Sequence, residues 1–581
     1  MRIMITVPLL FSFILLSCKK ENNFNERIVY GNSFALTIHK DKSAYRPGET
    51  VNFKLNREIA GIKISYKHLN QTIHTESIQG TSWTWKPPTD DFRGYFGELS
   101  VKSSSGTDSV IAGVGIDVSS DWSKFPRYGF LSNYGNLSEK EMNGVLENIT
   151  RWNLNGLQFY DWQYKHHKPL AGTAENPLNV WKEIANKDVH LKTLKYYISE
   201  AKKRNIKSMF YNLAFGVLED GFSDGVSKTW MLYKDPHQQN TDKHELPKPF
   251  FKSSIFVADA GNKGWQQYIA AENEKLYKAL DFDGYHVDAL GDRGALYNYE
   301  GEPVDQQNSF KPFLNAMKDR HPEKRLVMNA VNQWGKQAIL QSPVDFAYTE
   351  VWSPNDSYNS LKNIITENYE LSGGRPTVLA AYMNYGKNSS PGNFNTHSVL
   401  LTNAVIFASG GAHLELGEHM LGSEYFPNNN LKMPDDLRRE IIKYYDFLVA
   451  YQNLLRDGGS FEGKQIKSVN EEILVESWPG AAGKPATLMK RKDNLEIFHL
   501  INFTGTQVLN WRDESGSQQP PQVFINKELE IESAASVKKI WMASPDYLHG
   551  TSVELPFTQN GNKVLFKIPY LKYWNMVVVE Y

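Results

Sequence analysis

The 581-residue sequence contains a single cysteine, Cys18, and no excess of charge of either sign. One cysteine excludes an intramolecular disulfide. Because 64 Lys and Arg residues face 65 Asp and Glu residues, the formal net charge is −1, which gives no electrostatic reason to expect nucleic acid or an anionic membrane surface as a partner. A neutral ligand fits this composition better, and the length predicts two to four domains.

Several catalytic and binding motifs are also missing. No glycine-rich phosphate loop follows an early strand, no GxSxG elbow occurs, and no HxH or HExxH spacing is present. These absences disfavour a dinucleotide site, a serine hydrolase and a zinc hydrolase, so we expect no cofactor and no metal ion. The histidines at 166, 167, 286 and 413 leave a metal site as a weaker alternative.

An apolar run from Ile3 to Leu16 lies at the amino terminus and is too short to span a bilayer comfortably. It ends in Leu15-Leu16-Ser17-Cys18, which resembles the lipobox of bacterial lipoproteins. We expect residues 1–18 to be a lipoprotein signal peptide, Cys18 to carry lipid, and residues 19–29 to be a flexible stalk. The predicted location is the cell envelope, on the periplasmic or outer face of the outer membrane. A plain signal peptide with an incidental cysteine is the alternative.

The remaining sequence divides into three regions. Residues 30–120 and 457–581 alternate apolar and polar residues between Gly and Pro turns, which predicts an immunoglobulin-like β-sandwich and a second β-sandwich. Residues 121–456 alternate apolar runs with amphipathic segments, which predicts an α/β fold, a (β/α)8 TIM barrel closed by a helix within 434–456. An open doubly wound sheet is the runner-up. The eight expected strands lie within 127–135, 154–162, 206–216, 282–292, 325–335, 344–352, 377–386 and 411–418.

In such barrels catalytic groups project from the carboxyl ends of the strands, where the loops meet at one rim. Many of the expected strands end in polar or aromatic residues. A structural rim could also be polar, but these residues are the candidates for substrate binding: Asp161, Trp162, Tyr211, Asn212, His286, Asn329, Asn332, Trp352, Asn384 and Glu415.

The stretch "FDGYHVDALGDRG" carries three carboxylates around one expected strand. Asp288 shares period-two parity with His286, so both are predicted to face the barrel interior and Tyr285 to face the helices. Asp283 precedes the strand, where such residues cap or bond locally, and Asp292 lies in the following loop. Asp288 is therefore the carboxylate expected at the mouth.

A second carboxylate, Glu350, ends the sixth expected strand in "VDFAYTEVW". Carboxylates that end the fourth and sixth strands can face each other across the mouth, and glycoside hydrolysis needs such a pair. Glu415 and Glu418 are rival acids at the eighth strand, with Glu415 ranked lower because it is farther around the ring from the fourth.

The segments "FDGYHVDALGDRG", "AYTEVW" and "GLQFYDWQYKHHKPL" together resemble glycoside hydrolase family 66, the family of dextranases and cycloisomaltooligosaccharide glucanotransferases. The resemblance covers the barrel and the arrangement of both flanking β-regions. It implies Asp288 as nucleophile, Glu350 as acid/base and Asp161 as a ligand of the reacting sugar. It also implies double displacement with retention, carboxyl groups roughly 5 to 5.5 Å apart, and a Glu350 whose pKa is raised so that it stays protonated.

The glucanotransferases of this family resemble a barrel interrupted by an additional carbohydrate-binding domain, for which residues 377–418 leave no room. This favours the hydrolase, and we expect an endo-acting dextranase that cleaves α-1,6-glucan to isomaltooligosaccharides. We also expect a monomer. Three alternatives stay open: another retaining α-glycosidase, for example one that acts on α-galactosides; a glucanotransferase; and a non-catalytic surface lipoprotein that binds glycans.

Overall fold

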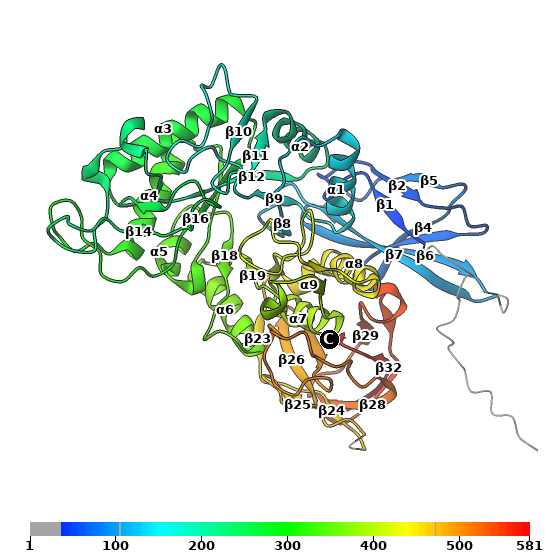
Figure 1. Ribbon diagram of the computed structural model, residues 1–581. Helices are drawn as coiled ribbons and strands as arrows, with labels where there is room; N and C mark the ends of the chain where they lie inside the picture. The colour runs from blue at the N-terminus through cyan, green and yellow to red at the C-terminus, as the bar shows by residue number, and fades with distance from the viewer. Residues whose placement is uncertain (1–35, 104–105, 471) are drawn as a thin grey trace, which may run out of the picture. The chain divides into compact units, whose positions relative to one another are not determined.

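The computed structural model of the protein describes residues 36–103, 106–470 and 472–581. The predicted signal peptide, Cys18 and the stalk lie outside these residues. Within them, no helix combines the length and the hydrophobicity needed to cross a membrane. Residues Thr37–Tyr581 form one compact unit (Figure 1), so the regions that we expected as separate domains are packed together.

The amino-terminal region consists of two antiparallel sheets. The first has the order β1-β2-β5 and the second β4-β3-β6-β7. Its immunoglobulin-like classification stays a prediction. The strands are β1 Ile38–Lys40, β2 Val51–Leu55, β3 Lys63–His68, β4 Gln71–Ser77, β5 Ser82–Trp85, β6 Arg93–Lys102 and β7 Asp108–Val118.

The central region is a barrel of parallel strands, as predicted, and every strand falls inside its expected segment. One run has the order β17-β16-β12-β9-β8 and the other β18-β19-β21. Parallel bridges between Asn329 and Tyr348 and between Phe130 and Gly417 join the two runs and close the ring. The strands are β8 Tyr128–Leu131, β9 Gly156–Phe159, β12 Lys207–Leu213, β16 Gly284–Asp288, β17 Arg325–Met328, β18 Ala347–Glu350, β19 Thr377–Ala380 and β21 Ala412–His413.

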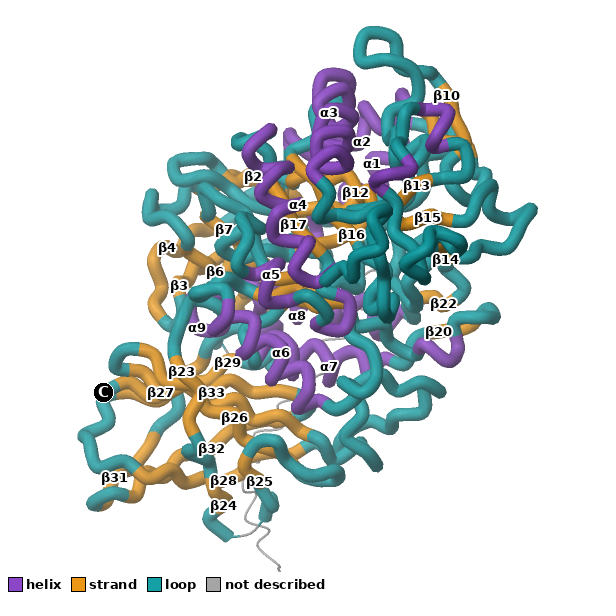
Figure 2. The backbone as a smooth tube through the Cα atoms, turned by 90° about the vertical axis from the view of Figure 1, so that its left-hand side faces the viewer, coloured by secondary structure: helices purple, strands orange, loops and turns teal. Residues whose placement is uncertain are grey.

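A helix follows each barrel strand, and the strands and helices alternate along the chain (Figure 2). The first helix begins with a capping box, in which the side chains of Ser138 and Glu141 each accept from the other's backbone N–H. The last long helix, α8, and the short α9 together fill the segment 434–456 that was expected to close the barrel. The helices are α1 Glu139–Arg151, α2 Leu191–Lys203, α3 Lys263–Ala279, α4 Gln306–Arg320, α5 Lys336–Leu340, α6 Tyr358–Leu371, α7 Thr396–Ala408, α8 Asp435–Ala450 and α9 Gln452–Leu455.

The loops of the barrel carry short elements of their own. Between Thr377 and Glu418 the chain forms only β19, η4, β20, α7 and β21, without an inserted domain. The short elements are β10 Val180–Lys182, β11 Asp188–His190, β13 Gly216–Val217, η1 Gly221–Asp224, η2 Lys228–Trp230, β14 Lys243–His244, β15 Ile255–Val257, η3 Val331–Gln333, η4 Tyr385–Lys387, β20 Gly392–Asn393 and β22 Leu431–Lys432.

The carboxyl-terminal region contains two further sheets. The larger has the order β23-β26-β27-β33-β29-β30, with β25 paired to β26, and the smaller β24-β28-β32-β31. One apolar cluster includes side chains from both, among them Phe498 and Phe566. The elements are β23 Ser460–Glu462, β24 Lys467–Ser468, β25 Glu476–Ser477, β26 Pro485–Lys492, β27 Leu495–Asn502, β28 Phe524–Glu532, β29 Lys539–Ala543, η5 Leu548–Gly550, β30 Val553–Glu554, β31 Phe557–Asn560, β32 Lys563–Leu571 and β33 Trp574–Glu580.

Both β-regions pack on barrel helices. The amino-terminal sheet contacts α8 through β6 and β7, and the backbone N–H of Gly115 donates to Asp446 on that helix. At the same junction Arg127 and Asp117 form a 2.7 Å ion pair with side chains only 1% and 0% exposed. The helix α7 packs against β27, and Figures 1 and 2 place α6 and α7 beside the carboxyl-terminal sheet. The two β-regions also contact each other, because Lys67 donates to Thr551 at 3.0 Å and Lys539 donates to Asn70 at 3.0 Å.

Candidate active site

The alternation along β16 is as the period-two pattern predicts. His286 is buried inside the barrel, where its Nδ1 lies 3.2 Å from the hydroxyl of Tyr128. Tyr285 points the other way and stacks on Phe210, with ring centroids 4.6 Å apart. Asp288 shares the parity of His286 and ends the strand, so its carboxylate lies above the packed interior at the mouth of the barrel.

The carboxylate of Asp288 accepts three hydrogen bonds. Its Oδ2 accepts from the hydroxyl of Tyr211 at 2.9 Å. Its Oδ1 accepts from the backbone N–H of Ala289 at 2.8 Å and from Nδ2 of Asn329 at 2.9 Å. These donors fix the orientation of the group while one side stays partly open to solvent.

The carboxylate of Glu350 lies beside that of Asp288, and the two share a hydrogen-bond donor. Nδ2 of Asn329 donates to Oε2 of Glu350 at 3.3 Å as well as to Asp288. The Oδ1 of Asn329 accepts from the backbone N–H of Glu350 at 3.1 Å, and the hydroxyl of Tyr382 donates to Oε1 of Glu350 at 2.8 Å. The structure thus brings together the two carboxylates that the sequence singled out.

Burial and neighbouring groups shift the pKa values of the two carboxylates. Burial, reinforced by the charge of Asp288, raises the pKa of Glu350 to about 7. Burial also raises the pKa of Asp288, but hydrogen bonds from Asn329, Ala289 and Tyr211 favour its ionised form. The raised pKa of Glu350 favours its protonated form near neutral pH, and the three donors to Asp288 favour the carboxylate there, as expected for an acid beside a nucleophile.

Asp161 follows β9 on the same rim and has a strained backbone, with φ of 44°. Burial, and then the charges of Glu183 and Asp288, raise the pKa of its carboxyl to about 8. Its neighbour Tyr160 packs against Tyr211 with ring centroids 4.9 Å apart. Asp161 is thus placed, partly exposed, near the pair, where its neutral carboxyl group can donate or accept a hydrogen bond.

Five of the predicted substrate-binding residues are buried, and here the structure corrects the sequence-based assignment. None of them is more than 1% exposed, so a sugar cannot reach them: Trp162, Asn212, His286, Asn384 and Glu415. Asn212 has the opposite parity to Tyr211, and its side chain bonds to His166 instead of facing the mouth. Trp162 lies in the core, where its indole N–H donates to the carbonyl of Tyr211.

The other corrections have similar causes. Glu415 accepts from Asn403 at 2.7 Å and from Tyr445 at 3.1 Å behind the barrel wall. Asn384 donates to the carbonyl of Asp513 at 2.8 Å and so holds a loop of the carboxyl-terminal region. These polar residues are buried because each finds its hydrogen-bond partners inside the protein.

The three other acids near the strands have structural roles, as expected for Asp283 and Asp292, whereas Glu418 was expected as a rival acid. Asp283 accepts from Lys207 and from the backbone N–H of Ser208 at the amino-terminal end of the barrel. Asp292 accepts from the backbone N–H of Gly294 in its own loop. Glu418 accepts from the backbone N–H and hydroxyl of Ser132, next to the bridge that closes the ring.

Of the remaining candidates, Trp352 is partly exposed and lies two residues after Glu350, the last residue of β18. Asn332 supports it, because its Oδ1 accepts from the backbone N–H of Trp352 at 3.2 Å and its Nδ2 donates to the carbonyl of Ser353 at 2.9 Å. The sequence reading missed Tyr382. Its parity with Ala380, which faces the barrel interior, is the signal that could have identified it.

One group of side chains in the described part of the chain has the composition of a metal site. Its ligand atoms, from His167, Asp220 and Asp224, lie within 4.8 Å of one another. Lys165 donates to both carboxylates at 2.6 Å, and Lys168 contacts Asp224 at 3.1 Å. Because ammonium groups already neutralise the carboxylates, this cluster has the chemistry of an ion-pair network and does not fit a divalent cation well.

A surface depression lies between α2 and the segment before β16, away from the rim that carries Asp288 and Glu350. It is lined by Lys202, Leu280 and Asp281. It is at the amino-terminal ends of the strands, the face associated with stability in such barrels. The chemistry is therefore better located by the paired carboxylates than by concavity alone.

The family model described as "Glycosyl hydrolase family 66" matches residues 40–578. The chain is 27% identical over 704 residues to a cycloisomaltooligosaccharide glucanotransferase of Niallia circulans, covering 94% of this chain and 71% of the relative. It is 24% identical over 576 residues to a dextranase of Streptococcus salivarius, covering 84% and 67%. A crystal structure of a Paenibacillus sp. cycloisomaltooligosaccharide glucanotransferase complexed with cycloisomaltoheptaose has the same fold, with a TM-score of 0.86, 23% identity, and coverage of 94% of this chain and 99% of that chain.

Proposed function

The chain belongs to glycosyl hydrolase family 66, and from this premise we propose that it hydrolyses internal α-1,6-glucosidic linkages of dextran to isomaltooligosaccharides with retention of configuration. Asp288 is the nucleophile and Glu350 the acid/base. The observation that carries the proposal is the bridging amide of Asn329, which bonds to both carboxylates at the mouth of the barrel.

The bridge supports the retaining geometry. Because one nitrogen lies 2.9 Å from an oxygen of Asp288 and 3.3 Å from an oxygen of Glu350, these two oxygens are separated by at most the sum of those distances. So short a limit for one oxygen of each group supports a closely spaced pair, as in retaining enzymes, whose carboxyl groups lie roughly 5 to 5.5 Å apart.

In the first step Asp288 attacks the anomeric carbon of a glucosyl unit while Glu350 gives its proton to the departing glycosidic oxygen. The raised pKa of Glu350, about 7, favours the proton that this step needs. The product is a glycosyl ester on Asp288 and a shortened glucan with a free hydroxyl.

In the second step Glu350, now ionised, removes a proton from water, and the oxygen of that water attacks the anomeric carbon. The bond to Asp288 breaks, and both carboxyl groups regain their first protonation states. Tyr211, Ala289 and Asn329 stabilise the carboxylate of Asp288 as it leaves, through the hydrogen bonds described above.

Hydrolysis is favoured over transfer because residues 377–418 contain no inserted domain, whereas the resemblance associates such a domain with the glucanotransferases. Water is then the acceptor, and the products are linear. A glucanotransferase would instead close the chain on itself.

The test is product analysis on dextran of defined length, with the anomeric configuration followed from the first turnover. Linear isomaltooligosaccharides released first as the α-anomer are expected, whereas cyclic products would favour the glucanotransferase and a β-anomer an inverting mechanism. Asp288→Asn is expected to abolish turnover with the fold intact. Full activity of that variant would discard Asp288 as the nucleophile. Release of sugar from α-galactosides but not from dextran would discard dextran as the substrate.

The proposal extends to the organisation of the chain. Residues 1–18 are a lipoprotein signal peptide whose Cys18 carries the lipid, and residues 19–29 are a stalk that tethers a monomeric enzyme to the cell envelope. Residues 30–120 are an immunoglobulin-like β-sandwich, residues 121–456 the catalytic barrel and residues 457–581 a second β-sandwich. Labelling with a radioactive fatty acid, lost in Cys18→Ser, tests the anchor.

A further inference from the structure

A long connection of the carboxyl-terminal region, residues 503–523 between β27 and β28, reaches the rim of the barrel. Its Asn510 pairs with Ser357 in the loop after β18, and its Trp511 donates through the indole N–H to the carbonyl of Asn355 at 2.7 Å. Oγ1 of Thr402, on α7, donates to the carbonyl of Trp511 at 3.1 Å. The loop that follows Glu350 is therefore held from outside the barrel.

Arg512 lies at the centre of this contact and is 3% exposed. Its guanidinium carbon is 4.9 Å from the ring centroid of Trp352, 5.5 Å from that of Tyr385 and 4.6 Å from that of Trp511. Nη2 of Arg512 donates to the carbonyl of Val351 at 2.7 Å. One planar cation thus fixes the backbone next to Glu350 and the aromatic side chain that follows it.

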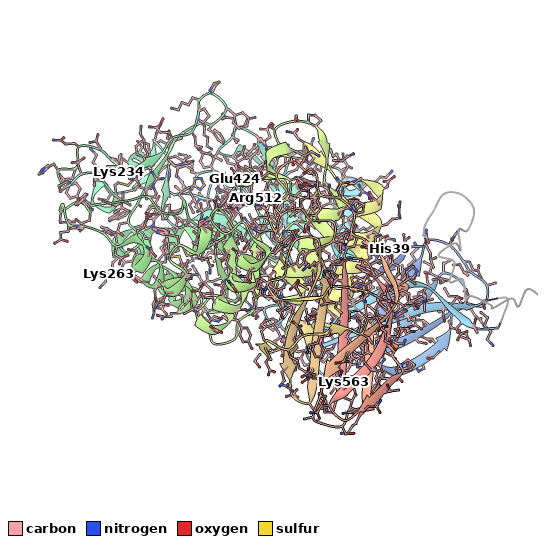
Figure 3. The ribbon with its side chains drawn as sticks, turned by 90° about the horizontal axis from the view of Figure 1, so that it is seen from below. His39, Lys234, Lys263, Glu424, Arg512 and Lys563 are labelled. Atoms are coloured by element: carbon pink, nitrogen blue, oxygen red, sulfur yellow. The ribbon has the colours of Figure 1, made fainter. Side chains whose placement is uncertain are left out.

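Trp352 and Tyr385 form a partly exposed aromatic pair on the outer side of this cation, with ring centroids 5.3 Å apart. The hydroxyl of Tyr385 donates to Glu424 at 3.0 Å, which steadies the second ring, and Figure 3 labels both Glu424 and Arg512. Trp352 also packs against Tyr382, with ring centroids 5.6 Å apart, and Tyr382 donates to Glu350. The pair therefore adjoins the proposed proton donor, where the leaving sugar must lie.

We propose that Arg512 is a positioning residue of the leaving-group site: it holds Trp352, which meets Tyr385 edge to face, as a platform for the glucosyl unit that departs and keeps Glu350 aimed at the glycosidic oxygen. This inference rests on the proposed function, because it presupposes that Glu350 protonates that oxygen. The carboxyl-terminal region is then part of the active site and not only a scaffold.

The chemistry of the guanidinium makes the proposal specific to arginine. A flat cation can lie against several rings while an in-plane N–H bonds to a carbonyl. The ammonium group of a lysine is compact and strongly hydrated, so it cannot do both from the same buried position. Arg512→Lys therefore keeps the charge but loses the arrangement.

The experiment compares two substrates in the full-length protein. Dextran needs the leaving-group site and the proton from Glu350. An α-isomaltosyl fluoride assayed with azide needs neither, because fluoride leaves unprotonated and azide attacks without a base. For Arg512→Lys we expect kcat/KM on dextran to fall about 10- to 100-fold, as for a small misplacement of reacting groups, while fluoride release changes less than about 3-fold.

Arg512→Met and Arg491→Lys complete the set. The first removes the charge at similar length and should reproduce the selective loss. The second alters an arginine of β26 that pairs with Glu462 and Glu496, away from the barrel, and should affect neither substrate. An equal loss on both substrates, or no loss on dextran, overturns the role of Arg512.

Glu350→Ala separates this inference from the proposed function. If Glu350 is the acid/base, that variant loses dextran hydrolysis and keeps azide-assisted release of fluoride. A Glu350→Ala enzyme that still hydrolyses dextran overturns the proposed function itself. A selective loss in Glu350→Ala without one in Arg512→Lys overturns only the positioning role.

Discussion

The hydroxyl of Tyr382 donates a 2.8 Å hydrogen bond to Oε1 of Glu350. This bond favours the ionised carboxylate and so opposes the upward shift that burial and Asp288 impose on the pKa of Glu350. Tyr382 thus offers a way to change the pKa of the proposed acid without altering either carboxylate.

Tyr382→Phe should move the alkaline limb of the pH profile for dextran hydrolysis to higher pH. Without the donor, the ionised form of Glu350 is less stable, and we expect a shift of about 0.5 to 1 pH unit in kcat/KM. Tyr445→Phe is the matched control, because that hydroxyl donates to the buried Glu415 instead. A limb that stays in place or moves down would contradict this role.

The wild-type enzyme should lose activity on dextran as the pH rises through about 7. The first step needs a protonated Glu350, whose pKa is raised to about 7, so the competent fraction falls above that pH. The same enzyme with α-isomaltosyl fluoride and azide should lack this limb because no acid is required. Identical limbs with both substrates would assign the titration to another group.

Asn329→Ala should impair catalysis through both carboxylates at once. The variant removes one donor that serves Asp288 and Glu350 together, and hydrogen bonds to charged groups contribute enough that we expect kcat/KM on dextran to fall about 10- to 100-fold. Asn359→Ala removes an amide that bonds to Trp478 instead and should leave the rate unchanged. Near wild-type activity of Asn329→Ala would show that the bridge is dispensable.

Asp161→Asn should stabilise the fold at alkaline pH relative to wild type. The pKa of Asp161 is raised to about 8 in the folded protein, whereas its ordinary value, taken for the unfolded chain, is 3.8. Between these values the folded chain holds a proton that the unfolded chain has released, so stability falls as the pH rises from about 4 through about 8. Asn cannot ionise and removes this dependence.

The measurement for Asp161→Asn is the free energy of unfolding in urea at pH 5 and pH 8. The free energy of unfolding of the variant should exceed that of wild type by on the order of 1 kcal/mol more at pH 8 than at pH 5. This value is reduced from the full effect of the pKa shift because the side chain is partly exposed to solvent. Asp281→Asn, at an exposed ion pair with Lys202, supplies the control. A gain that is the same at both pH values would contradict the shift.

Asp117→Asn should destabilise the junction between the amino-terminal sheet and the barrel. It leaves the guanidinium of Arg127, which is 1% exposed, without its carboxylate, and such a loss costs about 3–5 kcal/mol. Glu532→Gln, in the exposed pair with Lys467, should change stability little, because solvent screens that pair. Thermal unfolding of both variants measures the contrast, and equal effects would refute it.

The sequence alone determined the barrel and the two carboxylates at its mouth. Apolar runs mark strands that are buried on both faces, and period two assigned His286 and Asp288 to the interior. Because parallel strands deliver their carboxyl ends to one rim, residues 62 positions apart could be placed together before any coordinates.

The tertiary structure decided which of the polar residues at the strand ends reach the mouth. Tyr211 bonds to Asp288, whereas Glu415, which also lies at the end of an expected strand, is buried against Asn403 and Tyr445. Arg512 contacts the carbonyl of Val351 from 161 residues along the chain. Such contacts depend on how separate regions pack, which local periodicity does not encode, since it reports the face of an element and not its partner.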